Sequence, residues 1–98
     1  SNILYKNLKL AGAKIIVHDP YVKIWSEIGI KVENKLPSTK DIDGIIIAVS
    51  HTFYKKPYFF EWLNLEVLKI YDCVNILNQT KISKLIKKGS NILITGKG

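Results

Sequence analysis

The run Gly44-Ile45-Ile46-Ile47-Ala48-Val49 contains no polar residue that alternates with the hydrophobic ones. A strand with one face in water alternates apolar and polar residues, whereas a strand buried on both faces is apolar throughout. The run therefore predicts a parallel strand in a sheet covered by helices on both faces. No other segment of the chain constrains the fold class as strongly.

The segments on either side of this run alternate between helical and extended patterns. Strands are expected at 14–18, 30–32, 70–74 and 91–95. Helices are expected from Ser1 to Ala11, from Pro57 through Leu68, and, capped by Thr80, from Lys81 to Lys88 with Ile82, Leu85 and Ile86 facing inward. Alternation of this kind predicts right-handed crossovers and an open sheet. We expect one α/β domain over residues 1–98, a three-layer Rossmann-like fold with a mostly parallel sheet.

Composition excludes several classes of protein. The chain is 47% hydrophobic and 23% charged, which is ordinary for a globular domain. Its apolar runs are too short for a membrane span, and no stretch has the pattern of a signal peptide. Cys73 cannot form an internal disulfide, so we expect a reducing, cytoplasmic location. One cysteine and two histidines offer no metal-binding spacing.

The net charge is +7, and it comes from lysine without any arginine. Lysine supplies positive potential but not the planar, bidentate contacts of arginine. The charge therefore favours anionic partners in general and argues against sequence-specific recognition of nucleic acid. Several aromatic residues lie close to Lys55 and Lys56, and they either stack on single-stranded nucleic acid or pack a helix onto the sheet. Packing is the simpler interpretation for the aromatic set Tyr54, Tyr58, Phe59, Phe60 and Trp62.

Two candidate ligand residues follow strands, at the sheet edge where open α/β sheets bind ligands. Asp19 comes directly after the segment 14–18. Its carboxylate either accepts hydrogen bonds from a ribose or simply ends the strand together with Pro20. His51 follows the buried run and either contacts a ligand or holds its own loop. The structural role is the simpler one for both residues.

Two further candidates follow later strands. Asn75 either donates a hydrogen bond to a base or ribose, or caps a turn. Its neighbour Cys73 has no basic residue beside it in the sequence, which favours an inert buried thiol over a nucleophile. Lys97 lies between two glycines near the end of the chain, where a frayed terminus is the default interpretation. The chain contains neither G-x-G-x-x-G nor G-x-x-x-x-G-K-[ST], the glycine motifs that bind dinucleotides and nucleoside triphosphates.

Four segments, taken in order and at their spacing, resemble the UDP-glucose/GDP-mannose dehydrogenase family. The resemblance covers nearly the whole chain and is carried by Gly12–Val22, Asp43–His51, Asp72–Leu77 and Gly89–Gly98. Each segment alone is a weak signal, but the four together match the family's C-terminal domain. There they correspond to a strand with Asp-Pro, a buried strand ending near histidine, a "D-x-R-N-x-L" segment and a closing strand.

The resemblance implies the nucleotide-sugar-binding domain of an NAD-dependent UDP-sugar 6-dehydrogenase, an enzyme of polysaccharide biosynthesis. NAD and the catalytic cysteine and lysine would belong to the parent enzyme's other domains. Those domains would be this chain's partners, and the enzyme would form a homo-oligomer. This fragment would be inert alone and would carry no catalytic residue. It would bind the nucleotide end of the UDP-sugar substrate through Asp19, His51, Asn75 and Lys97.

Two departures from the family pattern define an alternative. Val74 stands where the family has the arginine that meets the nucleotide, and valine cannot form that charge-assisted contact. The family's first strand has no counterpart here, so we expect an exposed sheet edge, with strand exchange between chains or a rearranged sheet as compensation. The alternative is a stand-alone Rossmann-like binding module with a degenerate ligand site.

Overall fold

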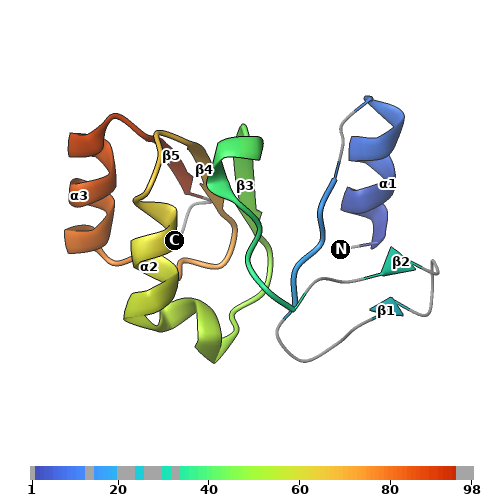
Figure 1. Ribbon diagram of the computed structural model, residues 1–98, viewed down its shortest axis with the longest axis horizontal. Coiled ribbons are helices and arrows are strands. Elements are labelled where there is room, and N and C mark those ends of the chain that lie inside the picture. The colour runs from blue at the N-terminus through green and yellow to red at the C-terminus, as the bar shows by residue number, and fades with distance from the viewer. Residues whose placement is uncertain (1, 13–14, 20–23, 26–29, 32–33, 95–98) are drawn as a thin grey trace. The chain divides into compact units, whose positions relative to one another are not determined.

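Three parallel strands form the sheet of residues 38–98 in this computed structural model (Figure 1). Strands β3 (Gly44–Ile47), β4 (Lys69–Asp72) and β5 (Asn91–Ile94) are neighbours in that order, and both pairs are parallel. Because neighbouring strands are parallel, β3 is joined to β4 and β4 to β5 by a crossover that returns the chain to the same end of the sheet. The predicted α/β class with a parallel sheet is confirmed.

The chain divides into two compact units, Ser1–Pro37 and Ser38–Gly98. The structure describes residues 2–12, 15–19, 24–25, 30–31 and 34–94. Among these residues, no helix has the length and hydrophobicity that a membrane span requires.

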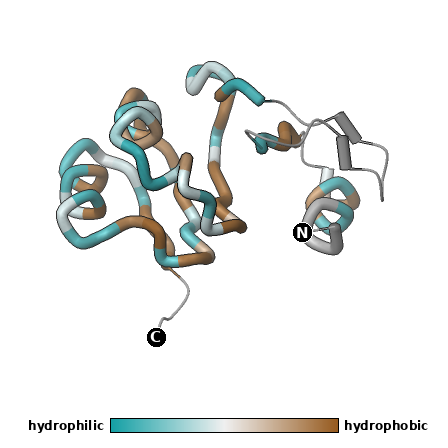
Figure 2. Tube along the Cα trace, turned by 90° about the horizontal axis from the view of Figure 1, so that it is seen from below, coloured by the Kyte–Doolittle hydropathy of each residue, from teal (hydrophilic) through white to brown (hydrophobic). Residues whose placement is uncertain are grey.

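Helices α2 (Pro57–Leu63) and α3 (Gln79–Lys88) form the crossovers and lie on one side of the sheet (Figure 1). Crossovers of the same hand between strands in sequence order place both helices on one face. Leu63 of α2, Leu85 of α3 and Ile70 of β4 are each no more than 1% exposed. The core therefore lies between this helical layer and the sheet. Figure 2 shows hydrophobic residues concentrated along the strands, while hydrophilic residues prevail on α3.

The aromatic residues before and within α2 pack against one another. They belong to the 3-10 helix η2 (Thr52–Lys55) and to α2, and Tyr54 and Phe59 are 8% and 3% exposed. Their rings meet edge to face with centroids 4.9 Å apart, and the Phe59 ring stacks on Trp62 at 5.6 Å. The interpretation of this cluster as packing is confirmed for these three side chains.

The other face of the sheet carries a row of apolar side chains. Ile46, Tyr71 and Leu93 lie side by side across the three strands, and Ile46 and Leu93 are 38% and 61% exposed. Residues 38–94 by themselves thus form two layers, helices and sheet. Among the described residues, no strand pairs with the outer side of β3. Exchange of a strand between chains stays a prediction.

Helix α2 is shorter than the sequence pattern predicts, because it ends at Leu63 and not near Leu68. The N–H of Asn64 closes the helix by donating to the carbonyls of Phe60 and Glu61. Leu68 lies at the entry to β4, where its N–H donates to the Ser90 hydroxyl at 3.0 Å and its side chain is buried. Val67 and Leu68 therefore lie in the segment that leads into β4 and not in the helix.

Helix α3 begins earlier than predicted, and its cap is Asn78 instead of Thr80. The Asn78 side-chain oxygen accepts a 2.9 Å hydrogen bond from the Lys81 N–H. The prediction that Ile86 faces inward is wrong, since Ile86 is 55% exposed while Leu85 is fully buried. Gly89 ends the helix as expected, with a φ of 115° that an L side chain rarely adopts.

Residues 1–37 contain helix α1 (Asn2–Leu10) and two strands of two residues each, β1 (Ile24–Trp25) and β2 (Ile30–Lys31), paired antiparallel. Gly12 follows α1 with a φ of 89°, as the predicted helix stop requires. The expected strand at 14–18 is not formed in its described part, where only His18 makes an isolated bridge. A β-branched sequence becomes a strand only when a ladder partner is present.

Candidate ligand site at the carboxyl edge of the sheet

The loops that follow β3 and β4 leave the sheet at the same edge. Ile47, the last residue of β3, pairs with Asp72, the last residue of β4, in a parallel ladder. The Cys73 N–H then donates to the Ile47 carbonyl at 3.0 Å, which fixes the start of the second loop beside the first. Because ligands of open α/β sheets bind at the carboxyl ends of the strands, this edge is the candidate site.

Asp72 organises the loop after β4. Its side chain is fully buried, and its carboxylate accepts hydrogen bonds from three backbone N–H groups. The N–H groups of Val74 and Ile76 donate to Oδ1 at 3.2 and 3.1 Å, and that of Leu77 donates to Oδ2 at 2.9 Å. A buried carboxylate is tolerated when several donors replace its hydration shell, and these bonds wrap residues 73–77 around it.

The role of Asp72 is not evident from the sequence. The available signal was the tendency of aspartate to bond a backbone N–H two residues later, which is seen here at Val74. The bonds to Ile76 and Leu77 depend on the path of the whole loop, so sequence spacing could not reveal them.

Asn75 stands at the exposed turn of this loop. Its φ of 57° lies in the left-handed region, which asparagine tolerates better than most residues other than glycine. The loop is held from within by Asp72, and the Asn75 residue is exposed to solvent at the carboxyl edge. This exposure leaves its amide accessible to a ligand that offers hydroxyl, carbonyl or imide groups.

His51 lies after β3 at the position that precedes η2. Its backbone carbonyl accepts a 3.0 Å hydrogen bond from the Tyr54 N–H, whereas its side chain does not cap the turn. The half-buried imidazole meets the Tyr54 ring edge to face, with centroids 6.0 Å apart. Packing of the ring against Tyr54 thus fixes a histidine next to the candidate site.

The remaining residues of these loops limit the chemistry. Val74 is half-buried, and its N–H donates to the Asp72 carboxylate. Because its side chain is apolar, this position offers no positive charge. Neither 48–56 nor 73–78 contains a glycine, and the close approach of a backbone to the NAD pyrophosphate depends on glycine. These loops do not fit NAD. Among the described residues, no group of three or more histidine, cysteine, aspartate or glutamate side chains could hold a metal ion.

Asp19 lies in the other unit, residues 1–37, and is half-buried. Asn34 holds this segment from two sides. Its side-chain amide donates to the Asp19 carbonyl at 2.8 Å, and its own carbonyl lies 3.0 Å from His18 Nε2. Burial lowers the pKa of His18 below 6.5, although the Asn34 carbonyl and the charge of Asp19 oppose this shift. His18 and Asp19 are thus held by the side chain and the backbone carbonyl of Asn34.

The four predicted ligand residues therefore do not all lie at one site. His51 and Asn75 lie at one edge of one sheet, on the loops after neighbouring strands. Asp19 belongs to the other unit, and Lys97 lies outside the described residues. Comparisons of the chain with protein-family models, with proteins of known function and with solved structures found no match.

Proposed function

We propose that this chain is the nucleotide-sugar-binding domain of an NAD-dependent UDP-sugar 6-dehydrogenase. The observation that carries the proposal is the pairing of Ile47 with Asp72, because it brings the His51 and Asn75 loops to one carboxyl edge. The four-segment sequence resemblance supplies the identity of the ligand. In this proposal the parent enzyme binds NAD and oxidises the sugar C6 alcohol elsewhere, and this domain contributes binding alone.

The proposed contacts use one polar side chain from each loop, the exposed Asn75 and the half-buried His51. The Asn75 side-chain amide offers two N–H donors and one carbonyl acceptor, which suit ribose hydroxyls or the uracil edge. The His51 imidazole supplies a second polar group after the neighbouring strand. Asp72 does not meet the ligand in this proposal, since its carboxylate is already bonded to three N–H groups. It keeps the Asn75 loop in its bound-state conformation, which lowers the ordering cost of binding.

Val74 favours the second candidate, a binding module whose nucleotide site is degenerate. Without a cation at this position, the diphosphate loses the charge-assisted contact that the resemblance implies. The two candidates differ in one measurable property, which is whether the chain as it stands binds a UDP-sugar.

The test is a titration of the full chain, labelled with ¹⁵N, with UDP-glucose and with UDP. We expect saturable shifts of the amide signals of 50–52 and 73–77. The variant Asn75→Gly removes the amide and keeps the left-handed backbone, so it should weaken binding about tenfold, or about 1.4 kcal/mol. The control Asn91→Ala changes an exposed asparagine at the opposite edge of the sheet and should leave affinity unchanged.

If no saturable shifts appear up to roughly millimolar ligand, the degenerate module is favoured. A Kd of that size corresponds to a binding free energy of about −4 kcal/mol. In that case Val74→Arg should create UDP binding, because it restores the cation beside the diphosphate. If Val74→Arg also fails to bind UDP, neither candidate stands.

A further inference from the structure

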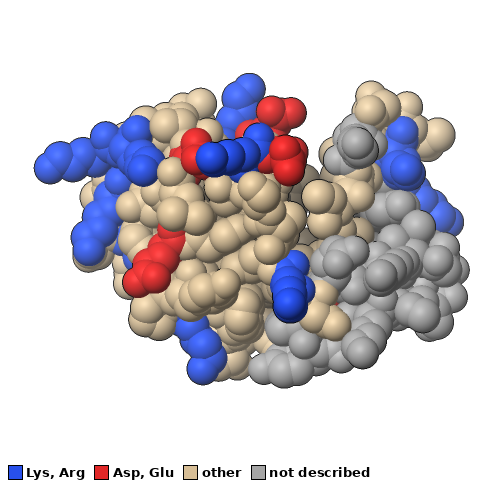
Figure 3. Space-filling view, viewed as in Figure 1, with Lys and Arg blue, Asp and Glu red and all other residues tan. Residues whose placement is uncertain are grey.

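Helix α3 presents lysines without any acidic residue. Four of its ten residues are Lys81, Lys84, Lys87 and Lys88, and none is aspartate or glutamate. Over the rise of an α-helix they span about 10 Å along the axis. Figure 3 shows lysine side chains projecting from the part of the surface where Figure 1 places α3. Helix α3 therefore carries charge of one sign only.

The stability of the helix does not explain all of these charges. Lys87 and Lys88 lie in the last turn, where the negative end of the helix dipole favours cations. Lys81 lies in the first turn, near the positive end, and that turn contains no acidic residue. Lys84 and Lys88 are four residues apart, a spacing at which like charges repel. Lys81 and Lys84 therefore stand at positions where their positive charge lowers the stability of the helix.

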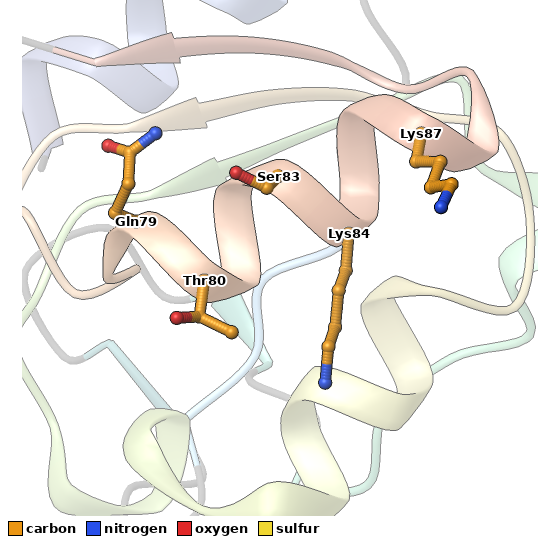
Figure 4. A pocket seen from close by; sticks show the side chains of 5 residues that line it. All are labelled: Gln79, Thr80, Ser83, Lys84 and Lys87. Carbon is orange, nitrogen blue, oxygen red and sulfur yellow. The ribbon is translucent and has the colours of Figure 1, made fainter.

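The same flank of α3 is hollowed and lined by hydrogen-bond donors. A shallow hollow of about 380 Å³ is bordered by Gln79, Thr80, Ser83, Lys84 and Lys87, all on α3 (Figure 4). Lys84 extends from α3 toward α2, while Thr80 lies one turn before it (Figure 4). Hydroxyl, amide and ammonium groups thus border one shallow, open hollow on α3.

A second hollow of about 410 Å³ continues this surface between α2 and α3. It shares Thr80 and Lys84 with the first, and its other lining residues include Phe60, Lys81 and Glu61. Glu61 is the one acidic residue among those that line the two hollows. The Lys81 ammonium lies 6.0 Å from the centre of the Phe60 ring and 3.5 Å from the Lys55 carbonyl. These contacts orient Lys81 and bring the exposed Lys55-Lys56 pair to the same basic surface.

We propose that this surface of α3 and α2 docks the phosphodiester backbone of a polynucleotide without reading its sequence. Phosphate oxygens are bound by lysine, serine, threonine and glutamine side chains, and those are the groups that line the first hollow. A protein partner fits less well, because the cores of protein interfaces are depleted in lysine. Without arginine the surface has no bidentate donor for base edges, so binding depends on charge and on salt.

The test measures fluorescence anisotropy of a labelled single-stranded oligothymidylate with the full chain between about 50 and 200 mM salt. If the four lysines of α3 each neutralise one phosphate, the slope of log K against log salt is about −2.8 for a single strand. The double variant Lys84→Gln/Lys87→Gln should make the slope less steep by about 1.4. Oligoadenylate should bind with the same slope, because the backbone is the ligand.

The matched control is Lys40→Gln/Lys69→Gln, which removes the same net charge from exposed lysines that are not part of α3 and do not line either hollow. We expect its slope to equal that of the unmodified chain. Equal slope changes in the two double variants would mean that total charge alone attracts the strand, which overturns a docking surface on α3. An unmodified chain that shows no binding at about 50 mM salt would overturn it as well. Circular dichroism of all three proteins checks that the glutamine substitutions leave the fold intact.

Discussion

The Asp72 carboxylate and the Leu77 backbone N–H, five residues apart, are joined by a 2.9 Å hydrogen bond that closes the loop after β4. With the bonds to Val74 and Ile76, it makes a buried charge the centre of the candidate site. The loop's shape therefore depends on one side chain whose charge is satisfied by backbone donors.

Asp72→Asn should destabilise the chain by about 3 kcal/mol, because an amide N–H₂ then faces a backbone N–H that has lost its acceptor. The measurement is the midpoint of urea unfolding followed by circular dichroism. Asp43→Asn is the control, since Asp43 is exposed and should change stability by less than about 0.5 kcal/mol. Equal stability of the two variants would contradict the role assigned to the buried carboxylate.

Asn78→Ala should cost about 1 kcal/mol, because the Lys81 N–H loses the side chain that caps α3. Asn78→Asp should retain the cap and add a favourable charge at the positive end of the helix. Thermal unfolding of the two variants and of Thr80→Ala separates the caps. If Thr80→Ala is the more damaging substitution, the helix begins where the sequence pattern predicted.

Leu85→Ala should destabilise by about 3 kcal/mol, because it opens a cavity at a side chain that is 0% exposed. Ile86→Ala, one residue further along α3, should cost less than about 0.5 kcal/mol because Ile86 is 55% exposed. Urea unfolding of the pair tests the orientation of the helix directly. Similar losses for both would show that Ile86 is buried.

Stability should fall as the pH drops below 6.5, because the pKa of His18 is lowered mainly by burial. Between the folded and unfolded pKa values the unfolded chain binds more protons, so protonation favours unfolding there. His18→Gln keeps a donor for the Asn34 carbonyl and removes the titration, so it should reduce this pH dependence. The ring proton signals of His18 should titrate below pH 6.5. A midpoint above that value would contradict the burial effect.

The α/β class followed from local patterns, and particular elements show why. The apolar run at 44–49 predicted a parallel strand, and its first four residues form β3. Pro57 and Gly89 marked the start of α2 and the end of α3, because proline lacks an N–H and glycine accepts positive φ. These signals act within a few residues, so they can be read without the rest of the chain.

Local sequence patterns revealed less of the candidate site. His51 and Asn75 were found because both follow predicted strands, and parallel strands end at one edge. Asp72 was missed, since its three donors are collected by the path of a loop.

The sequence by itself determined the order of strands and α-helices in 38–94, and that the strands are parallel, because apolar spacing and turn residues are local properties. Only the tertiary structure decided that Leu68 enters β4 through the Ser90 hydroxyl, and that residues 15–17 are not a strand. Both outcomes depend on hydrogen-bond partners far away in the chain. Extended backbone becomes a strand only when another segment satisfies its N–H and C=O groups, and one segment cannot specify that partner.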